Sequence, residues 1–152
     1  MTAQGDADAT FVVVTVGSCL CAVPIADVVE TMRPLPVEPI AGAPSFVCGI
    51  AILRGIPVPV VDLGLLLAVP AMRGARFVAL RLGERRVAMK VDDVVGVRRL
   101  QTSTLLEVPS LLGGVGTELV EALGTLDTQL LMVLRASRIL PTETWEWPEV
   151  TT

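Results

Sequence analysis

The sequence predicts a mainly β protein built from two similar small β-barrels. The chain has 152 residues, of which 52% are hydrophobic and 18% charged, so it can bury a sizeable core. Valine-rich runs of strand length are separated by glycine-containing turns, a pattern typical of β-hairpins. The second half of the chain repeats the pattern of the first, which favours an internal duplication.

The repeat appears when the chain is compared with itself at an offset of 66 residues. Seven positions of residues 11–29 are then identical, and they pair Phe11 with Phe77, Val12 with Val78, Gly17 with Gly83, Ala22 with Ala88, Asp27 with Asp93, Val28 with Val94 and Val29 with Val95. A tight turn needs the backbone freedom of glycine, so the repeated glycine supports duplication. We expect a first barrel at about residues 11–70 and a second at about 76–135, joined by an apolar seam whose groove can bind another protein.

The first half reads as a short terminus followed by hairpins. Residues 1–10 are small and polar and are expected to form a flexible N-terminus. The strand-like runs are residues 11–16, 19–23, 43–55 and 56–63. Apolar residues at positions 25, 28, 29 and 32 have the spacing of about two helical turns. Pro57 and Pro59 predict an edge strand or the start of a strand, because neither can donate a backbone hydrogen bond.

The second half restarts after the best linker candidate, residues 70–74. The strand-like runs are residues 77–83, 85–91, 92–100, 120–123 and 129–134. A last helical turn is expected over residues 136–140. Residues 141–152 form an acidic tail that contains both tryptophans, Trp145 and Trp147. Such side chains tend to fold back on the protein or join a partner, but two exposed tryptophans on a disordered tail are about equally expected.

The composition excludes most enzyme chemistry. The chain has no histidine, which removes the Ser-His-Asp triad, histidine metal ligands and a phosphoryl-accepting histidine. It also has no glycine-rich phosphate loop and no nucleophile elbow. Cys19, Cys21 and Cys48 make a poor zinc site without histidine, and we expect buried, inert thiols in a reducing cytosol. No catalytic residue, metal ligand or cofactor is therefore expected.

The hydropathy raises the question of a membrane span. Mean hydropathy is +0.67, and residues 9–26 form an uncharged run of 18 residues. That run contains Gly17 and Pro24, is rich in β-branched residues, and follows acidic rather than basic residues. The sequence therefore predicts no direct membrane insertion and a cytoplasmic location.

Charge is unevenly distributed along the chain. Residues 73–99 carry a net charge of +5, whereas residues 1–72 and 100–152 carry −4 and −5. A basic segment of this kind can bind nucleic acid, steer an acidic protein or simply form the solvated faces of strands, and the last is favoured. Small barrels that bind nucleic acid stack bases on aromatic side chains. The basic segment has only Phe77, which is expected in the core, so no nucleic-acid partner is expected.

Residues 49–63, G-I-A-I-L-R-G-I-P-V-P-V-V-D-L, resemble a motif of the CheW family, roughly G-x-x-N-x-R-G-x-x-x-P-x-x-D-L. The chain matches the glycine, the Arg-Gly pair, the proline and the Asp-Leu pair, and it has Ile52 in place of the asparagine. A V-x-E element at residues 28–30 and a glycine-led hairpin at residues 123–127 extend the resemblance over residues 11–140, which would form one CheW-like domain.

The resemblance implies two five-stranded SH3-like barrels with short helical turns and a short C-terminal helix. It implies a non-catalytic adaptor that couples bacterial chemoreceptors to the histidine kinase CheA. The partners would be the regulatory domain of a CheA-type kinase and the cytoplasmic tip of a chemoreceptor, with the protein recruited to membrane-associated receptor arrays. Adaptors of this kind also serve twitching and gliding pathways, and that alternative stays open.

The family's binding residues can be carried over to five positions. The resemblance implies that Val28 and Glu30 lie on a surface turn that binds a partner and that Gly49 lies on a docking segment. Arg54 matches a near-invariant arginine, and Val97 matches an apolar position that faces the receptor groove. We expect Glu30 and Arg54 to form an ion pair that holds the turn against the following strand.

Overall fold

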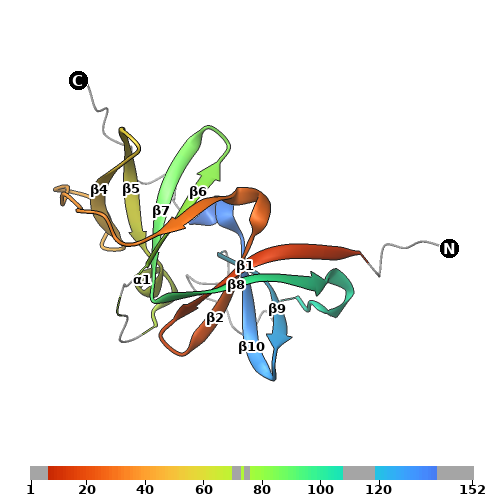
Figure 1. Ribbon diagram of the computed structural model, residues 1–152. Coiled ribbons are helices and arrows are strands. Elements are labelled where there is room, and N and C mark those ends of the chain that lie inside the picture. The colour runs from red at the N-terminus through yellow and green to blue at the C-terminus, as the bar shows by residue number, and fades with distance from the viewer. Residues whose placement is uncertain (1–6, 70–72, 74–75, 108–118, 140–152) are drawn as a thin grey trace.

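The computed structural model describes residues 7–69, 73, 76–107 and 119–139 (Figure 1). Within these residues the fold is mainly β, with one short α-helix, α1 (Leu63–Leu67). The strands are β1 (Asp8–Val16), β2 (Cys19–Pro24), β3 (Val28–Met32), β4 (Val47–Leu53), β5 (Ile56–Asp62), β6 (Arg76–Leu82), β7 (Arg85–Val91), β8 (Asp93–Gln101), β9 (Val120–Leu126) and β10 (Gln129–Leu134). Short 3-10 turns are η2 (Ile25–Asp27), η3 (Thr102–Thr104) and η5 (Ala136–Arg138).

The strands form two five-stranded mixed sheets. The first sheet has the order β8-β1-β2-β10-β9, and the second sheet has the order β3-β6-β7-β5-β4. In each sheet one ladder is parallel, between β2 and β10 and between β5 and β7, and the others are antiparallel. Figure 1 shows the two sheets side by side, with the second sheet at the upper left and the first at the lower right.

The sequence suggested that the two halves of the chain, separated between residues 70 and 76, would each form one barrel. The sheets do not follow this division, because each contains strands from both halves. Each sheet takes a hairpin from one repeat and three strands from the other, because β3 leaves the sheet of β1 and β2 and β8 leaves the sheet of β6 and β7. The connections force this exchange: only η2 separates β2 from β3, and only Asp92 separates β7 from β8. Such short links cannot carry the third strand of each repeat back beside the first.

The repeat in the sequence is matched in the ladders. Val12 lies opposite Val23 in β1–β2, and at an offset of 66 residues Val78 lies opposite Met89 in β6–β7. Each strand of the first repeat has an equivalent five places later in the second repeat, so that β1 corresponds to β6 and β5 to β10. When every strand is exchanged for its equivalent, the strand order of the first sheet becomes that of the second. The bulges agree as well, since Val29 in β3 and Val95 in β8 are the residues skipped by their ladders.

Three predicted elements need correction or limits. The helical turns expected over residues 25–32 are wrong: η2 is a single 3-10 turn, and residues 28–32 form β3. The terminus expected over residues 1–10 ends earlier, because β1 begins at Asp8. The last helical turn is present as η5, whereas residues 141–152, with both tryptophans, lie outside the described residues.

Pro57 and Pro59 lie at the start of β5, which agrees with one of the two roles predicted for them. As a whole β5 is not an edge strand, because it has β4 on one side and β7 on the other, but at the two prolines it is paired with β4 alone. The parallel ladder to β7 covers only residues 60–62, beyond both prolines. The missing N–H groups therefore cost the sheet no hydrogen bond to β7.

Apolar side chains fill both faces of the sheets. The largest buried cluster combines Val14 and Leu134 of the first sheet with Val61, Leu80 and Met89 of the second. Each sheet also has a smaller core on its other face, around Phe77 in the second sheet and around Phe11 in the first. Strands buried on both faces read as continuous valine-rich runs, which explains the high hydropathy without a membrane span. The largest cluster is the apolar seam that the sequence predicts.

The chain beyond one edge of each sheet meets the other edge through an isolated bridge. After β3, Glu38 exchanges two backbone hydrogen bonds of 2.8 Å with Ile50 of β4. After β8, Leu106 exchanges two of the same length with Leu123 of β9. The two edges of each sheet are thereby brought toward each other, β3 toward β4 and β8 toward β9.

Candidate functional site

The two opposite charges predicted to meet do so across the second sheet. Arg54 donates from Nε to Oε2 of Glu30 at 2.6 Å and from Nη2 to Oε1 at 2.8 Å. This bidentate geometry fixes both side chains more firmly than a single contact would. The predicted pair is confirmed, but Glu30 lies on the edge strand β3 and not on a helical turn. The pair connects one edge of the sheet to the turn at the other edge.

Local backbone geometry places both partners. Arg54 and Gly55 form the β4–β5 turn with φ values of 51° and 79°, so the arginine projects from a tight hairpin. Glu30 follows the bulge at Val29 on the half-buried side of β3. The guanidinium of Arg54 holds the pKa of the Glu30 carboxyl below its usual value, chiefly by hydrogen bonding. Glu30 in turn raises the pKa of Arg54.

Gly49 has a steric role that its predicted place in a docking segment does not reveal. It is buried in β4 with φ at 148°, where glycine is favoured. A Cβ at this position would lie 2.0 Å from the backbone oxygen of Glu38. The glycine therefore allows the chain after β3 to approach β4 and form the bridge at Ile50.

Val28 and Val97 occupy different environments. Val28 is half-buried at the start of β3 and packs against the core between the sheets. Val97 lies in β8, the edge strand of the first sheet, opposite Val12, and is 55% exposed. The structure therefore places Val28, Glu30, Gly49 and Arg54 in the second sheet and Val97 in the first.

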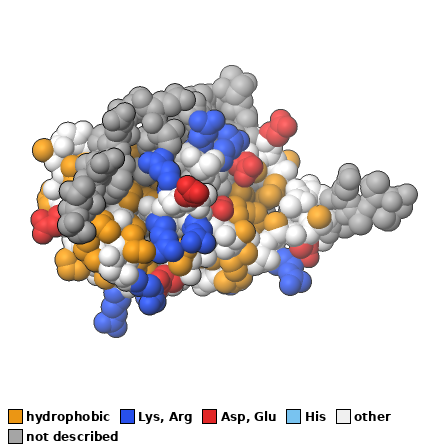
Figure 2. Space-filling view, turned by 90° about the horizontal axis from the view of Figure 1, so that it is seen from above, with side chains coloured by type: hydrophobic (Ala, Val, Ile, Leu, Met, Phe, Trp, Pro, Cys, Tyr) orange, Lys and Arg blue, Asp and Glu red, His pale blue; other side chains and the backbone are white. Residues whose placement is uncertain are grey.

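Exposed apolar residues around Arg54 were missed by the sequence analysis as parts of a site. Ile52 is 60% exposed and Ile56 is 42% exposed, one on each strand of the hairpin that carries Arg54. The available signal was the isoleucine at the position where the CheW motif has asparagine. Figure 2 shows hydrophobic side chains interspersed with basic ones on one face of the molecule.

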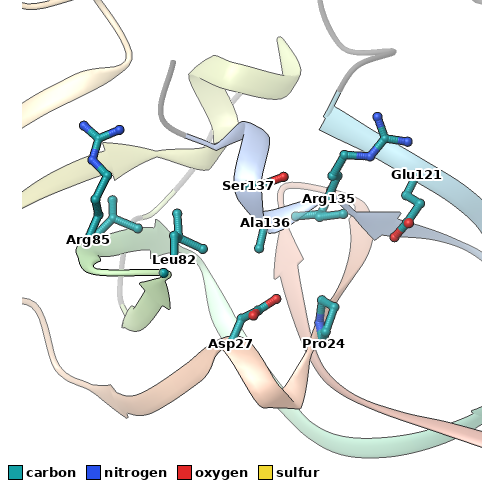
Figure 3. A pocket seen from close by; sticks show the side chains of 11 residues that line it. Pro24, Asp27, Leu82, Arg85, Glu121, Arg135, Ala136 and Ser137 are labelled. Atoms are coloured by element: carbon teal, nitrogen blue, oxygen red, sulfur yellow. The ribbon is translucent and has the colours of Figure 1, made fainter. Parts of the chain in front are cut away.

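A cavity of about 480 Å³ lies between elements of the two sheets, where the repeat predicts a groove (Figure 3). Its apolar wall includes Leu82, Val87 and Leu134. Its charged lining residues are Asp27, Arg85, Glu121 and Arg135. In Figure 3, Asp27 and Pro24 face Ala136 and Ser137 of η5 across the space.

The basic segment is divided between the two sheets. Arg81 and Arg85 belong to the β6–β7 hairpin of the second sheet, whereas Arg98 and Arg99 belong to β8 of the first. Phe77, the only aromatic residue of the segment, is 2% exposed and lies in the core, as predicted. The segment therefore offers no aromatic platform for stacking bases.

The expectation of buried cysteines is correct for Cys21 and wrong for Cys19 and Cys48, which are only partly buried. All three are free, and burial raises the pKa of the Cys21 thiol to about 12, so it stays protonated and unreactive near neutral pH. Burial also raises the pKa of Cys48. Among the described residues no cluster of three metal-ligating side chains occurs, and no helix is long and apolar enough to cross a membrane.

Comparison with known proteins agrees with the fold and the motif. Residues 10–144 match the model of the CheW-like domain. The chemotaxis protein CheW of Klebsiella aerogenes is 28% identical over 136 residues, which cover 88% of this chain and 82% of that protein. The crystal structure of the scaffolding protein TtCheW from Thermoanaerobacter tengcongensis has a TM-score of 0.82 at 21% identity, over 93% of this chain and 98% of that one. Because the family model covers most of its length, this chain belongs to the CheW-like domain family.

Proposed function

We propose that this protein is a non-catalytic scaffold that couples chemoreceptors to a CheA-type histidine kinase in the bacterial cytoplasm. The observation that carries the proposal is the match of residues 10–144 to the CheW-like domain. The shared fold with a scaffolding protein and the absence of histidine from the chain support it. Its partners would be the kinase's regulatory domain and the receptor's cytoplasmic tip, at membrane-associated receptor arrays.

The second sheet provides the surface that we assign to the kinase domain. Glu30 and Arg54 present an oriented pair of charges, and Ile52 and Ile56 are exposed on the same hairpin as Arg54. Exposed apolar side chains beside oriented charges suit a partner that buries the former and pairs with the latter. In this scheme Gly49 and Val28 act through the shape and packing of β4 and β3.

The first sheet provides the surface that we assign to the receptor. Val97 is exposed on β8, and nearby Val95 is 40% exposed. An apolar stripe on a sheet edge can pack against the apolar face of a helical receptor tip. Because the two surfaces belong to different sheets, both partners can bind at once, as coupling requires.

The test measures binding of the purified protein to each partner from the same genome by calorimetry. Wild type should bind both the kinase regulatory domain and a receptor-tip fragment. Glu30→Lys should lose kinase binding at least tenfold, a change of about 1.4 kcal/mol, and Val97→Glu should do the same to receptor binding. Matched controls are Glu107→Lys, which makes the same charge reversal, and Leu130→Glu, which also replaces an exposed apolar side chain by glutamate, at other positions of the chain.

Failure of the wild type to bind either partner, at low and at physiological salt, would contradict the proposal. Repeating the assay with regulatory domains from twitching or gliding kinases identifies the pathway. Preference for one of those domains would keep the adaptor function and change only the system it serves.

A further inference from the structure

The two halves of the duplicated fold differ at the link that crosses from one sheet to the other. In the second half this link is Asp92, whose carboxylate accepts a hydrogen bond of 2.6 Å from the backbone N–H of Gly17 in the β1–β2 turn. The same carboxylate accepts from the backbone N–H of Arg73. At an offset of 66 residues, Gly17 corresponds to Gly83 of the β6–β7 turn. Asp92 corresponds to Ala26 of η2, which has no carboxylate to offer to that turn.

The cavity of about 480 Å³ between the sheets opens at this place. Gly83 lines it, and so do Pro24, just before η2, and Asp27, the last residue of η2. The two equivalent glycines have similar backbone conformations, with φ values of 58° at Gly17 and 68° at Gly83. A turn that binds a carboxylate of its own chain in one half therefore borders a cavity in the other. A carboxylate from outside the chain would complete the same contact at Gly83.

One wall of this cavity is apolar. It is formed by Leu82 and Val87 of the second sheet and by Leu134 of the first. The volume is many times the roughly 30 Å³ that a water molecule takes up in the liquid, so the cavity has room for a small organic molecule. Because elements of both sheets line the cavity, such a molecule would contact both sheets at once. The apolar wall requires that it carry an apolar group.

Charges of both signs stand around the apolar wall. Arg85 and Arg135 are positive, and Asp27 and Glu121 are negative, so the lining is neutral as a whole. The ion pair found among the described residues lies elsewhere, at the β4–β5 turn, so these four charges do not neutralise one another by direct contact. Figure 3 shows the carboxylate of Asp27 directed into the space. A ligand that complements this lining carries one negative and one positive group.

We propose that this cavity binds a free α-amino acid with an apolar side chain. The carboxylate of the ligand accepts from the backbone N–H of Gly83, as that of Asp92 accepts from Gly17, with Arg85 on the same hairpin. The ammonium group pairs with Asp27, and the side chain packs on the apolar wall. An amino acid carries its two charges on one carbon, which suits partners that line a single cavity. The inference goes beyond the scaffold function and does not depend on it, because it concerns a small molecule bound by the protein alone.

Nuclear magnetic resonance of the isotope-labelled whole protein tests the proposal, with L-leucine as the probe. The amide signal of Gly83 should shift saturably, with a Kd of about 1 mM or tighter. The amide of Gly17 already donates to Asp92 and should not shift, so it serves as an internal control. Two analogues keep the apolar group of leucine and one of its charges: isocaproate lacks the ammonium group, and isoamylamine lacks the carboxylate. Each should bind at least about tenfold more weakly than leucine.

Two variants and two matched controls locate the site. Asp27→Asn and Arg85→Gln each remove one charge from the cavity and should weaken leucine binding at least about tenfold. Neither residue is buried, so both variants should fold. The control Asp93→Asn changes the equivalent of Asp27 in the other half, and Arg86→Gln changes the neighbour of Arg85, which lies outside the lining of this cavity. Both controls should bind leucine as the wild type does.

Three results would overturn the proposal. A Gly83 amide that does not respond to leucine would show that the cavity takes up no amino acid. Equal binding of leucine and either analogue would show that the protein does not recognise both charges. Undiminished binding in both cavity variants would place leucine at another surface.

Discussion

The first and second sheets share a backbone plan and differ in what lies at their edges. Strand order, ladder register and the bulged valines agree between them. The β4–β5 and β9–β10 turns agree too, with φ values of 51° and 79° at residues 54 and 55 and of 49° and 69° at residues 127 and 128. The shared features are all properties of the backbone, set by turns, bulges and alternation of apolar residues.

The side chains at the edges have diverged. Glu30 of the second sheet corresponds to Gly96 in the first, and Arg54 corresponds to Asp127, so the ion pair has no counterpart at these positions. Both edge strands expose their bulged valine, Val29 in β3 and Val95 in β8, but β8 also exposes Val97 where β3 has Thr31. A duplicated framework can therefore keep its fold while each copy acquires its own surface chemistry.

The largest expected effect follows from the exchange of strands between the repeats. If the chain is cut within residues 70–75, neither fragment alone should show a cooperative thermal transition, since each sheet needs strands from both. A mixture of the two fragments should recover the β-type circular dichroism of the intact chain and migrate with it in gel filtration. A first fragment that folds as a monomer would show that β3, β4 and β5 can replace their equivalents.

Gly49 tests whether the two bridges are built in the same way. Gly49→Ala should destabilise the protein by about 1–3 kcal/mol from its backbone angle alone, and further through the contact with Glu38. The equivalent residue in β9 is Ala122, for which Ala122→Gly should cost about 0.5–1 kcal/mol through chain entropy. Urea unfolding measures both. Equal losses of unfolding free energy in the two variants would mean that the backbone at Glu38 can move away from an added Cβ with little loss of stability.

The helical turns after β5 and β10 differ in their caps. The carboxylate of Asp62 accepts a hydrogen bond from the backbone N–H of Leu65 at 3.1 Å, as expected of a helix cap, whereas Arg135 makes no side-chain cap to η5. Asp62→Ala should therefore cost about 1 kcal/mol in urea unfolding. Arg135→Ala should not remove a cap and should therefore lower the stability less than Asp62→Ala does. Equal losses of stability in the two variants would show that the cap of Asp62 contributes nothing measurable.

The smallest effect concerns the exposed ion pair. Because Arg54 lowers the pKa of Glu30 in the folded state, the pair stabilises the protein above the pKa that Glu30 has when unfolded. That contribution is lost as the pH falls through the lower, folded pKa. Glu30→Gln should lower Tm slightly at neutral pH, and the difference from wild type should vanish in acid and shrink in high salt. A difference that stays constant with pH would assign the effect to packing.

The hairpins, the duplication and the Glu30–Arg54 pair could be predicted from the sequence, because each depends on local spacing or on a recognisable motif. The strand β3 could not. Val29 is 48% exposed at a bulge, while Glu30 turns to the half-buried side to meet Arg54. The apolar residues of this strand, Val28, Val29 and Met32, therefore do not alternate with polar ones. Together with Ile25 they have the spacing that is typical of a helix.

The exchange of strands was also hidden, for a different reason. Equivalent strands of the two repeats carry the same pattern, so apolar alternation cannot say which sheet each one joins. The short links at η2 and Asp92 determine which sheet β3 and β8 join. Asp92 is held there by its backbone N–H, which donates to Thr15 at 2.9 Å, and by its carboxylate, which accepts from Gly17 at 2.6 Å. Such tertiary contacts have no signature in a single sequence.

Because each sheet contains strands of both repeats, a single repeat could not form a complete sheet by itself. Alone, five such strands could complete their two sheets only by exchanging strands with a second copy, as a symmetric homodimer. In such a dimer every surface occurs twice, and any substitution changes both copies. Joining the copies in one chain removes that constraint, so an edge that carries an ion pair and an edge that exposes Val97 can coexist. The molecule thereby gains two unlike faces, each present once.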